Sequence, residues 1–216
     1  MATTTEAVPR GRRGRPTKGE LKEGAILEAA ESLLAERSFG EISVDELARA
    51  AGISRPNFYF YFGSKEDVLL ALVDRIAEGL MQQSVEIAER LSSDPRAAFE
   101  AAIAATARAW REHPAVARAA VETWGSVPRM GELWDRIITW FVDVLTPAIS
   151  AEQKSGHAPV SEASARNLAN ALVLMNERCF YAAAIGSEVA LPEGEIVPTL
   201  AEIWMRAVYG AVPASR

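Results

Sequence analysis

Four polar residues at the spacing of a short helix are the chain's clearest candidates for chemistry: Ser54, Arg55, Asn57 and Tyr59. Asparagine can read adenine through two hydrogen bonds and arginine can read guanine, so Arg55 and Asn57 are candidates for contacts with base edges. At least half of protein–DNA contacts go to the backbone, so the alternative for either residue is a phosphate. The chemistry indicated is recognition of double-stranded DNA.

A helix-turn-helix would position these side chains. Its first helix is predicted over residues 43–51, because Ser43 lies three residues before Glu46 in a capping-box pattern. A turn follows in which Gly52 can take the left-handed backbone conformation that a tight helix stop needs. In such a motif the second helix enters the major groove.

The second helix is predicted over residues 54–61, with Ser54 as its cap and Pro56 early in it, where a missing N–H costs least. The aromatic run over residues 58–62, which contains Phe58, Phe60 and Phe62, leaves a buried strand as the alternative. The flanking helical patterns favour a helix, with Phe62 in the core rather than in contact with DNA.

The whole chain is predicted to be all-α, because Ala, Glu, Leu and Arg dominate its periodic segments and no β-branched runs are bounded by turn pairs. About nine helices are predicted, over residues 20–37, 43–51, 54–61, 64–91, 95–112, 114–124, 128–153, 162–186 and 193–210. Three units follow: a disordered basic arm (1–18), a three-helix DNA-binding domain (19–66) and a helical ligand-binding and dimerisation domain (67–216).

The net charge of −6 is unevenly distributed. Residues 1–22 hold six basic and two acidic residues, so they carry +4 while the remaining chain carries −10. A phosphate backbone responds to the surface that docks on it, so the acidic total does not argue against DNA. Arg12, Arg13 and Arg15 are predicted to form an arm that follows the minor groove or the backbone. The alternative is a solubilising tail.

Several function classes find no support in the sequence. His113 and His157 stand apart without metal-ligand spacing, Cys179 has no histidine near it in sequence, and no glycine-rich phosphate loop is present, so neither an enzyme nor a cofactor is predicted. No apolar stretch reaches the roughly 18 residues of a membrane span. A single cysteine and the lack of an apolar leader fit the cytoplasm.

The stretch SVDELARAAGISRPNFYFYFGSKEDVLL, residues 43–70, resembles the helix-turn-helix of the TetR family of transcriptional regulators. The family's aromatic segment ends in Phe-x-x-Lys, here Phe62 to Lys65. Tyr61 stands where members often carry histidine, and tyrosine can still donate a hydrogen bond to phosphate. The resemblance implies that the DNA-binding surface includes Ser43, Ser54, Arg55, Pro56, Asn57, Tyr59, Tyr61 and Lys65.

Two distant stretches, ALVLMNERCFYA (171–182) and IWMRAVYG (203–210), resemble one subfamily of these regulators. Asn176 and Glu177 are polar residues in an otherwise apolar run, and a ligand could supply the partner that a buried polar group needs. The resemblance implies a hydrophobic, elongated effector held by Asn176, Phe180 and Trp204 and lined by Phe99, Thr106, Trp110, Trp134, Ile138, Phe141 and Leu145. The lining differs from that subfamily in type at Thr106, Ile138 and Leu145. The alternative is that these aromatic residues only fill a core.

The resemblance also implies a homodimer formed by the last two helices, which would let two recognition helices read a palindromic operator. Effector binding would pivot the helix predicted over residues 64–91 and change the spacing of the recognition helices. The predicted function is therefore a ligand-responsive repressor. An activator and a DNA-binding regulator without a small-molecule effector are the open alternatives.

Overall fold

The computed structural model describes residues 17–160 and 162–210. Within these ranges the protein is all-α, with nine α-helices, one short 3-10 helix and no strand. The predicted fold class is confirmed. The elements are α1 (Lys18–Glu36), η1 (Phe39–Glu41), α2 (Val44–Ala50), α3 (Arg55–Tyr61), α4 (Lys65–Ala88), α5 (Pro95–Glu112), α6 (Pro114–Thr123), α7 (Pro128–Ser155), α8 (Ala165–Ala184) and α9 (Glu193–Tyr209).

Local signals determine where most of these helices begin. Serine hydroxyls cap α2, α3, α4 and α8, and prolines occupy the first turn of α3, α5, α6 and α7. Thr17 and Glu20 form a capping box, so α1 begins at Lys18, inside the stretch that was predicted to be disordered. Residues 58–61 are helical, so the strand alternative for the aromatic run is wrong.

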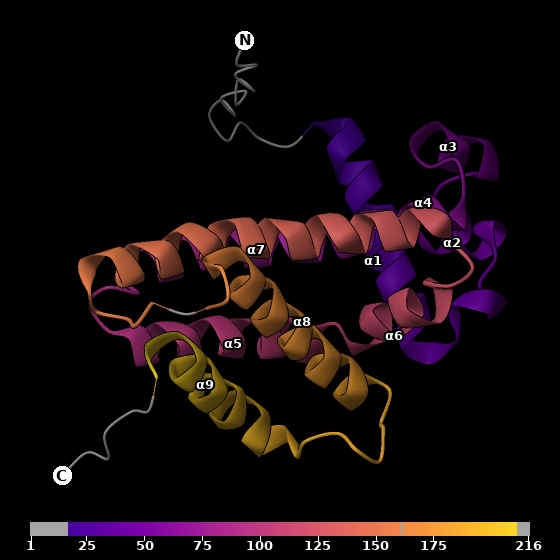
Figure 1. The fold of residues 1–216 in the computed structure, drawn as a ribbon. Helices are drawn as coiled ribbons and strands as arrows, with labels where there is room; N and C mark the ends of the chain where they lie inside the picture. The colour runs from indigo at the N-terminus through magenta and orange to yellow at the C-terminus, as the bar shows by residue number, and fades with distance from the viewer. Residues whose placement is uncertain (1–16, 161, 211–216) are drawn as a thin grey trace.

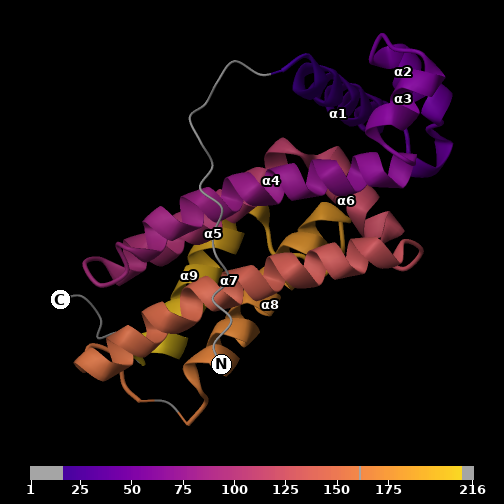
Figure 2. The same ribbon diagram turned by 90° about the horizontal axis from the view of Figure 1, so that it is seen from above.

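The first three helices form one end of the molecule, and α4 and α7 run from that end to the opposite one (Figures 1 and 2). A buried apolar cluster holds α1, α2 and α3 to the first half of α4. The same cluster continues into α6 and the start of α7, through residues such as Val116 and Met130. The DNA-binding end therefore shares its core with the larger half, across the predicted boundary at residue 66.

A second buried cluster fills the far half of the molecule. It joins α5, the second half of α7, α8 and α9, with Phe99, Ile149, Leu200 and Trp204 among its members. Figure 1 shows α8 and α9 next to each other on the side of the body away from α1. No helix of the described part is long and apolar enough to cross a membrane. This half is predicted to be the sensor.

Candidate DNA-binding surface and effector cavity

The turn between α2 and α3 has the geometry that the sequence predicts. Gly52 has a φ of 65°, a left-handed conformation that side chains with a Cβ rarely adopt. The Ile53 amide donates to the Ala48 carbonyl at 2.9 Å, which closes the end of α2. Phe58 and Phe62 are buried beneath the motif, as predicted for Phe62. The two helices are thus held as a rigid unit by backbone geometry and a shared core.

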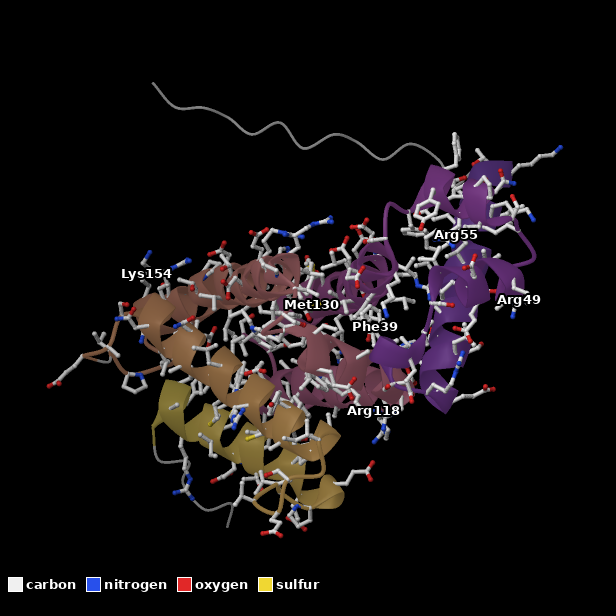
Figure 3. All side chains as sticks on the ribbon, turned by 90° about the vertical axis from the view of Figure 1, so that its right-hand side faces the viewer. Phe39, Arg49, Arg55, Arg118, Met130 and Lys154 are labelled. Carbon is white, nitrogen blue, oxygen red and sulfur yellow. The ribbon has the colours of Figure 1, made fainter. Side chains whose placement is uncertain are left out.

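Most of the predicted DNA-binding side chains lie exposed on one end of the molecule. Arg55, Pro56, Asn57 and Tyr59 are exposed on α3, while Tyr61 is half-buried. In Figure 3, Arg55 lies at this end and Lys154 of α7 marks the opposite one. This placement is compatible with docking into a groove. Arg12, Arg13 and Arg15 lie outside the described residues.

Arg55 is held in place before any DNA is bound. Its Nη1 lies 2.8 Å from Asp45 Oδ2, its Nη2 lies 3.4 Å from the Tyr59 hydroxyl, and its guanidinium lies 5.8 Å from the Tyr59 ring centroid. The hydrogen bond to Tyr59 and the charge of Asp45 raise the pKa of Arg55 above its ordinary value. If Arg55 contacts a guanine, as predicted, the base would compete with Asp45 for its guanidinium.

Ser43 and Ser54 act as helix caps. The Ser43 hydroxyl donates to Glu46 Oε2 at 2.7 Å, and the Ser54 hydroxyl accepts from the Asn57 amide at 3.4 Å. The hydrogen bonds from Ser43, aided by Arg37, lower the pKa of Glu46 to about 2. Both hydroxyls therefore position the backbone of the motif, and their contact with phosphate stays a prediction.

We predicted that Lys65 contacts a DNA phosphate, but in the structure it bonds to backbone carbonyl groups. Its Nζ donates to the carbonyl oxygens of Phe39 at 3.0 Å, Gly40 at 3.3 Å and Ile42 at 2.9 Å, and it lies 4.7 Å from the Phe39 ring centroid. An ammonium group has three donors, and here all three are occupied. Lys65 ties the η1 turn and Ile42, which precedes the cap of α2, to the start of α4.

Phe60 is a surface residue that sequence reasoning missed. Its side chain is 83% exposed on α3, and its ring lies edge-on to Tyr61 with centroids 5.2 Å apart. The sequence contains the information needed to place Phe60 on the surface, because a helix turns by about 100° per residue. Phe58 and Phe62 share a face at i, i+4, whereas Phe60 lies about 200° away from Phe58. An apolar ring on this face can contact a thymine methyl group.

A cavity of about 180 Å³ lies in the larger half, lined by residues of α4, α5, α6, α7, α8 and α9. Nine of the ten predicted effector-binding residues line it, namely Phe99, Thr106, Trp110, Trp134, Ile138, Phe141, Leu145, Asn176 and Trp204. Phe180 lies outside the wall, buried and stacked on Trp110 with ring centroids 6.4 Å apart. The aromatic residues thus surround a space as well as filling a core.

Few polar groups face this cavity. Asn176 Oδ1 accepts from Trp204 Nε1 at 3.0 Å, while its Nδ2 has no hydrogen-bond partner within the described residues. Burial raises the pKa of the neighbouring Glu177 carboxyl, although Arg178 opposes the shift. Because the Asn176 oxygen is already occupied, the amide can offer an incoming molecule a donor. The cavity therefore suits an apolar compound that carries a hydrogen-bond acceptor.

Two polar contacts join the larger half of the molecule to its DNA-binding end. His113, which lines the cavity, has its Nδ1 2.5 Å from Glu31 Oε1 of α1. Arg129 at the start of α7 pairs with Asp67 at the start of α4. Burial raises the pKa of Asp67, but the bonds from Arg129 and Ser64 outweigh it, so the pKa is lowered overall.

No group of three metal-ligating side chains occurs within residues 17–160 and 162–210. Burial raises the pKa of the Cys179 thiol, which keeps it protonated and makes it a weak nucleophile. Within the described residues, what this arrangement offers is an exposed binding surface and a lined cavity.

Comparison with known proteins identifies the family. Residues 26–72 match the family described as bacterial regulatory proteins, tetR family, and residues 99–210 match the C-terminal domain of transcriptional regulator EthR. The chain is 39% identical over 214 residues to the HTH-type transcriptional regulator EthR of Mycolicibacterium smegmatis, covering 99% of this chain and 98% of the relative. The chain belongs to the TetR family, with an EthR-type C-terminal domain. The subfamily likeness predicted from residues 171–182 and 203–210 is confirmed.

Solved structures share the fold of this TetR-family regulator at low identity. SmeT, the repressor of a Stenotrophomonas maltophilia multidrug efflux pump, matches with a TM-score of 0.70 at 18% identity, over 89% of this chain and 94% of SmeT. FadR of Bacillus subtilis in complex with stearoyl-CoA matches with a TM-score of 0.65 at 17% identity, over 88% of this chain and 99% of FadR. The relatives are named as transcriptional regulators, and this chain is a DNA-binding regulator of the same kind.

Proposed function

We propose that this regulator is a repressor that binds a palindromic operator in the cytoplasm as a homodimer and is released by a hydrophobic small molecule. The observation that carries the proposal is that α4 belongs to both functional regions. Its first half packs into the core of the helix-turn-helix through Val68, Leu69 and Leu72, while Val73, Ile76 and Leu80 line the cavity. A molecule in the cavity thus contacts the helix that carries the DNA-reading unit.

On DNA, Arg55 and Asn57 would contact base edges, because both are exposed on α3 and offer the donors that guanine and adenine recognise. Tyr59, Tyr61 and the hydroxyls of Ser43 and Ser54 would contact phosphates, with Pro56 packed beside them. Arg12, Arg13 and Arg15 would follow the backbone or minor groove next to this surface. The Lys65 ammonium would act indirectly, by holding the η1 turn.

The last two helices would form the dimer. Leu174 of α8 and Ile203 of α9 are 45% and 40% exposed, and Ile185 lies exposed at the end of α8. Large apolar side chains on neighbouring helices favour burial against a second copy. A two-fold axis through these helices would present two α3 helices to two half-sites.

The effector would be apolar with a hydrogen-bond acceptor. The wall is built from aromatic and aliphatic side chains, and the Asn176 amide supplies a donor. The structural neighbour from Bacillus subtilis binds stearoyl-CoA, which supports a long apolar chain as the class of effector.

Release would follow from movement of α4 and α6 around the bound molecule. His113 lines the cavity and bonds to Glu31 of α1, so a ligand that displaces His113 would also disturb the position of α1. Coupling between two such sites is typically about 1–3 kcal/mol, a change of roughly 5–150-fold in operator affinity.

The test begins with selection of bound sequences from random duplex DNA, which gives the operator and its half-site spacing. Operator affinity is then measured with and without a saturating uncharged compound such as dodecanol. We expect a palindrome and a loss of affinity of roughly 5–150-fold with the compound. Equal operator affinities with and without a compound that demonstrably binds would rule out control by an effector. The proposal of DNA binding would remain.

A further inference from the structure

A second, polar cleft of about 200 Å³ adjoins the effector cavity between α4 and α5. The two spaces share four wall residues, Ile76, Leu80, Ala109 and His113. The rest of the cleft is lined by Arg75, Gly79, Gln83, Ala105, Arg108 and Glu112. An apolar space and a polar one therefore share a partition.

Small residues leave room on the cleft side of this partition. Gly79 of α4 has no atom within 4 Å of where a Cβ would be, and Ala105 and Ala109 face it from α5. No side chain larger than a methyl group stands at these three positions. Ile76, Leu80, Ala109 and His113 line both spaces, so a chain in the cavity has a short path to the cleft past one layer of side chains.

The cleft holds guanidinium groups that can bind an anion. Arg108 donates to Gln83 Oε1 at 3.4 Å, and no carboxylate of the described residues pairs with it. Arg75 lies 3.5 Å from Glu31 Oε2, the upper end of ion-pair distances. Glu112 is the one carboxylate in the wall, and Glu31 lies just outside it beside Arg75, so Arg108 is the guanidinium of this wall that no described carboxylate pairs with.

We propose that this cleft binds the anionic head group, a carboxylate or a phosphate, of an effector whose single apolar chain occupies the cavity. This inference rests on the proposed function. The planar guanidinium fork matches two oxygens of either anion, and the charged head would stay near water while the tail is buried.

The cleft also lies on the route from cavity to DNA. Arg75 and His113 both contact the Glu31 carboxylate of α1. An anion at the cleft competes with Glu31 for these two partners, and α1 loses its polar attachment to α4 and α6. The head group would thus act on the DNA-binding end while the tail supplies affinity.

The experiment measures dissociation constants of three probes with the same twelve-carbon chain, dodecanoate, dodecyl phosphate and dodecanol, each below its micelle-forming concentration. The proteins are the full-length chain, Arg108→Gln, and Arg118→Gln as a control with the same change of charge. Arg118 is exposed on α6 and lines neither the cavity nor the cleft (Figure 3).

We expect at least one anionic probe to bind the unaltered chain about tenfold more tightly than dodecanol, and the tighter of the two identifies the head. Arg108→Gln should abolish most of this preference while changing dodecanol binding less than about twofold, and Arg118→Gln should preserve it. If dodecanol binds as tightly as the anionic probes, or if both variants lose the preference for an anion equally, the head-group site is overturned. The effector cavity would still stand in either case. If none of the three probes binds, the effector cavity itself is overturned.

Discussion

The two functional ends of the molecule hold their groups in different ways. At the DNA-binding end, Ser43 bonds to Glu46 three residues away and Arg55 to Asp45 ten residues away, and the reading side chains are exposed. At the cavity, Asn176 meets Trp204 across 28 residues, and the wall draws on six helices. The DNA-reading surface is built from local contacts, whereas the cavity exists only because distant helices pack together. A single substitution at one end should therefore leave the binding groups of the other end in place, even though a bound effector would couple the two ends through α4.

The largest effect is expected for Asn57→Ala. Loss of a two-point base contact costs about 2 kcal/mol per half-site, so a dimer on a palindrome should lose about a thousandfold in operator affinity. The measurement is fluorescence anisotropy with the selected operator and with a scrambled duplex of equal length. Effector affinity should not change, and Gln82→Ala on α4 is the exposed-amide control. An equal loss on both duplexes would assign Asn57 to a phosphate instead.

Lys65→Met tests whether this residue is a support or a DNA contact. Removing the ammonium leaves three carbonyl groups without their charged donor, so the free energy of unfolding should fall by about 2 kcal/mol in urea denaturation. Lys22→Met, at an exposed position of α1, should change it by less than about 0.5 kcal/mol. A drop of about 0.9 in the salt slope of DNA binding, with unchanged stability, would restore the phosphate role.

Trp204→Phe tests the cavity end. It removes the donor to Asn176 Oδ1, so the free energy of unfolding should fall by about 1–2 kcal/mol and dodecanol affinity should change. Operator affinity without effector should stay the same. Trp140→Phe, outside the cavity wall, is the matched control. A change in effector-free operator affinity confined to Trp204→Phe would show that this substitution also disturbs the DNA-binding end.

The smallest effect concerns Phe60. If its exposed ring covers a thymine methyl, replacing that thymine with uracil should weaken binding about fourfold, because one buried methyl is worth about 0.8 kcal/mol. Phe60→Ala should bind both duplexes equally. Replacing each thymine of a half-site in turn locates the contact. If the replacement weakens binding of Phe60→Ala as much as binding of the unaltered chain, Phe60 does not contact the methyl group.

The difference between local contacts and contacts between distant helices also explains what could be predicted from the sequence. Helix starts at Ser43, Ser54 and Ser64 were predictable because a cap and its amide lie three residues apart. The partners of Lys65 lie 23 to 26 residues away, and Glu31 and His113 are 82 apart, so only the fold brings them together. Cavity residues were found through resemblance, which gave nine of ten. Residue types at helical spacing do not distinguish a filled core from one that encloses a space.

The length of α4 sets the scale of the mechanical signal. At 1.5 Å per residue its 24 residues span about 36 Å, so the helix can act as a lever between cavity and DNA. A tilt of about 5° about its far end would move its first turn by about 3 Å. That displacement is close to the 3.4 Å rise of one base pair. In a symmetric dimer the partner would move equally, so the distance between the two recognition helices would change by twice as much. In the proposed dimer, a rotation of this size would be enough to shift the two recognition helices away from the spacing of two half-sites.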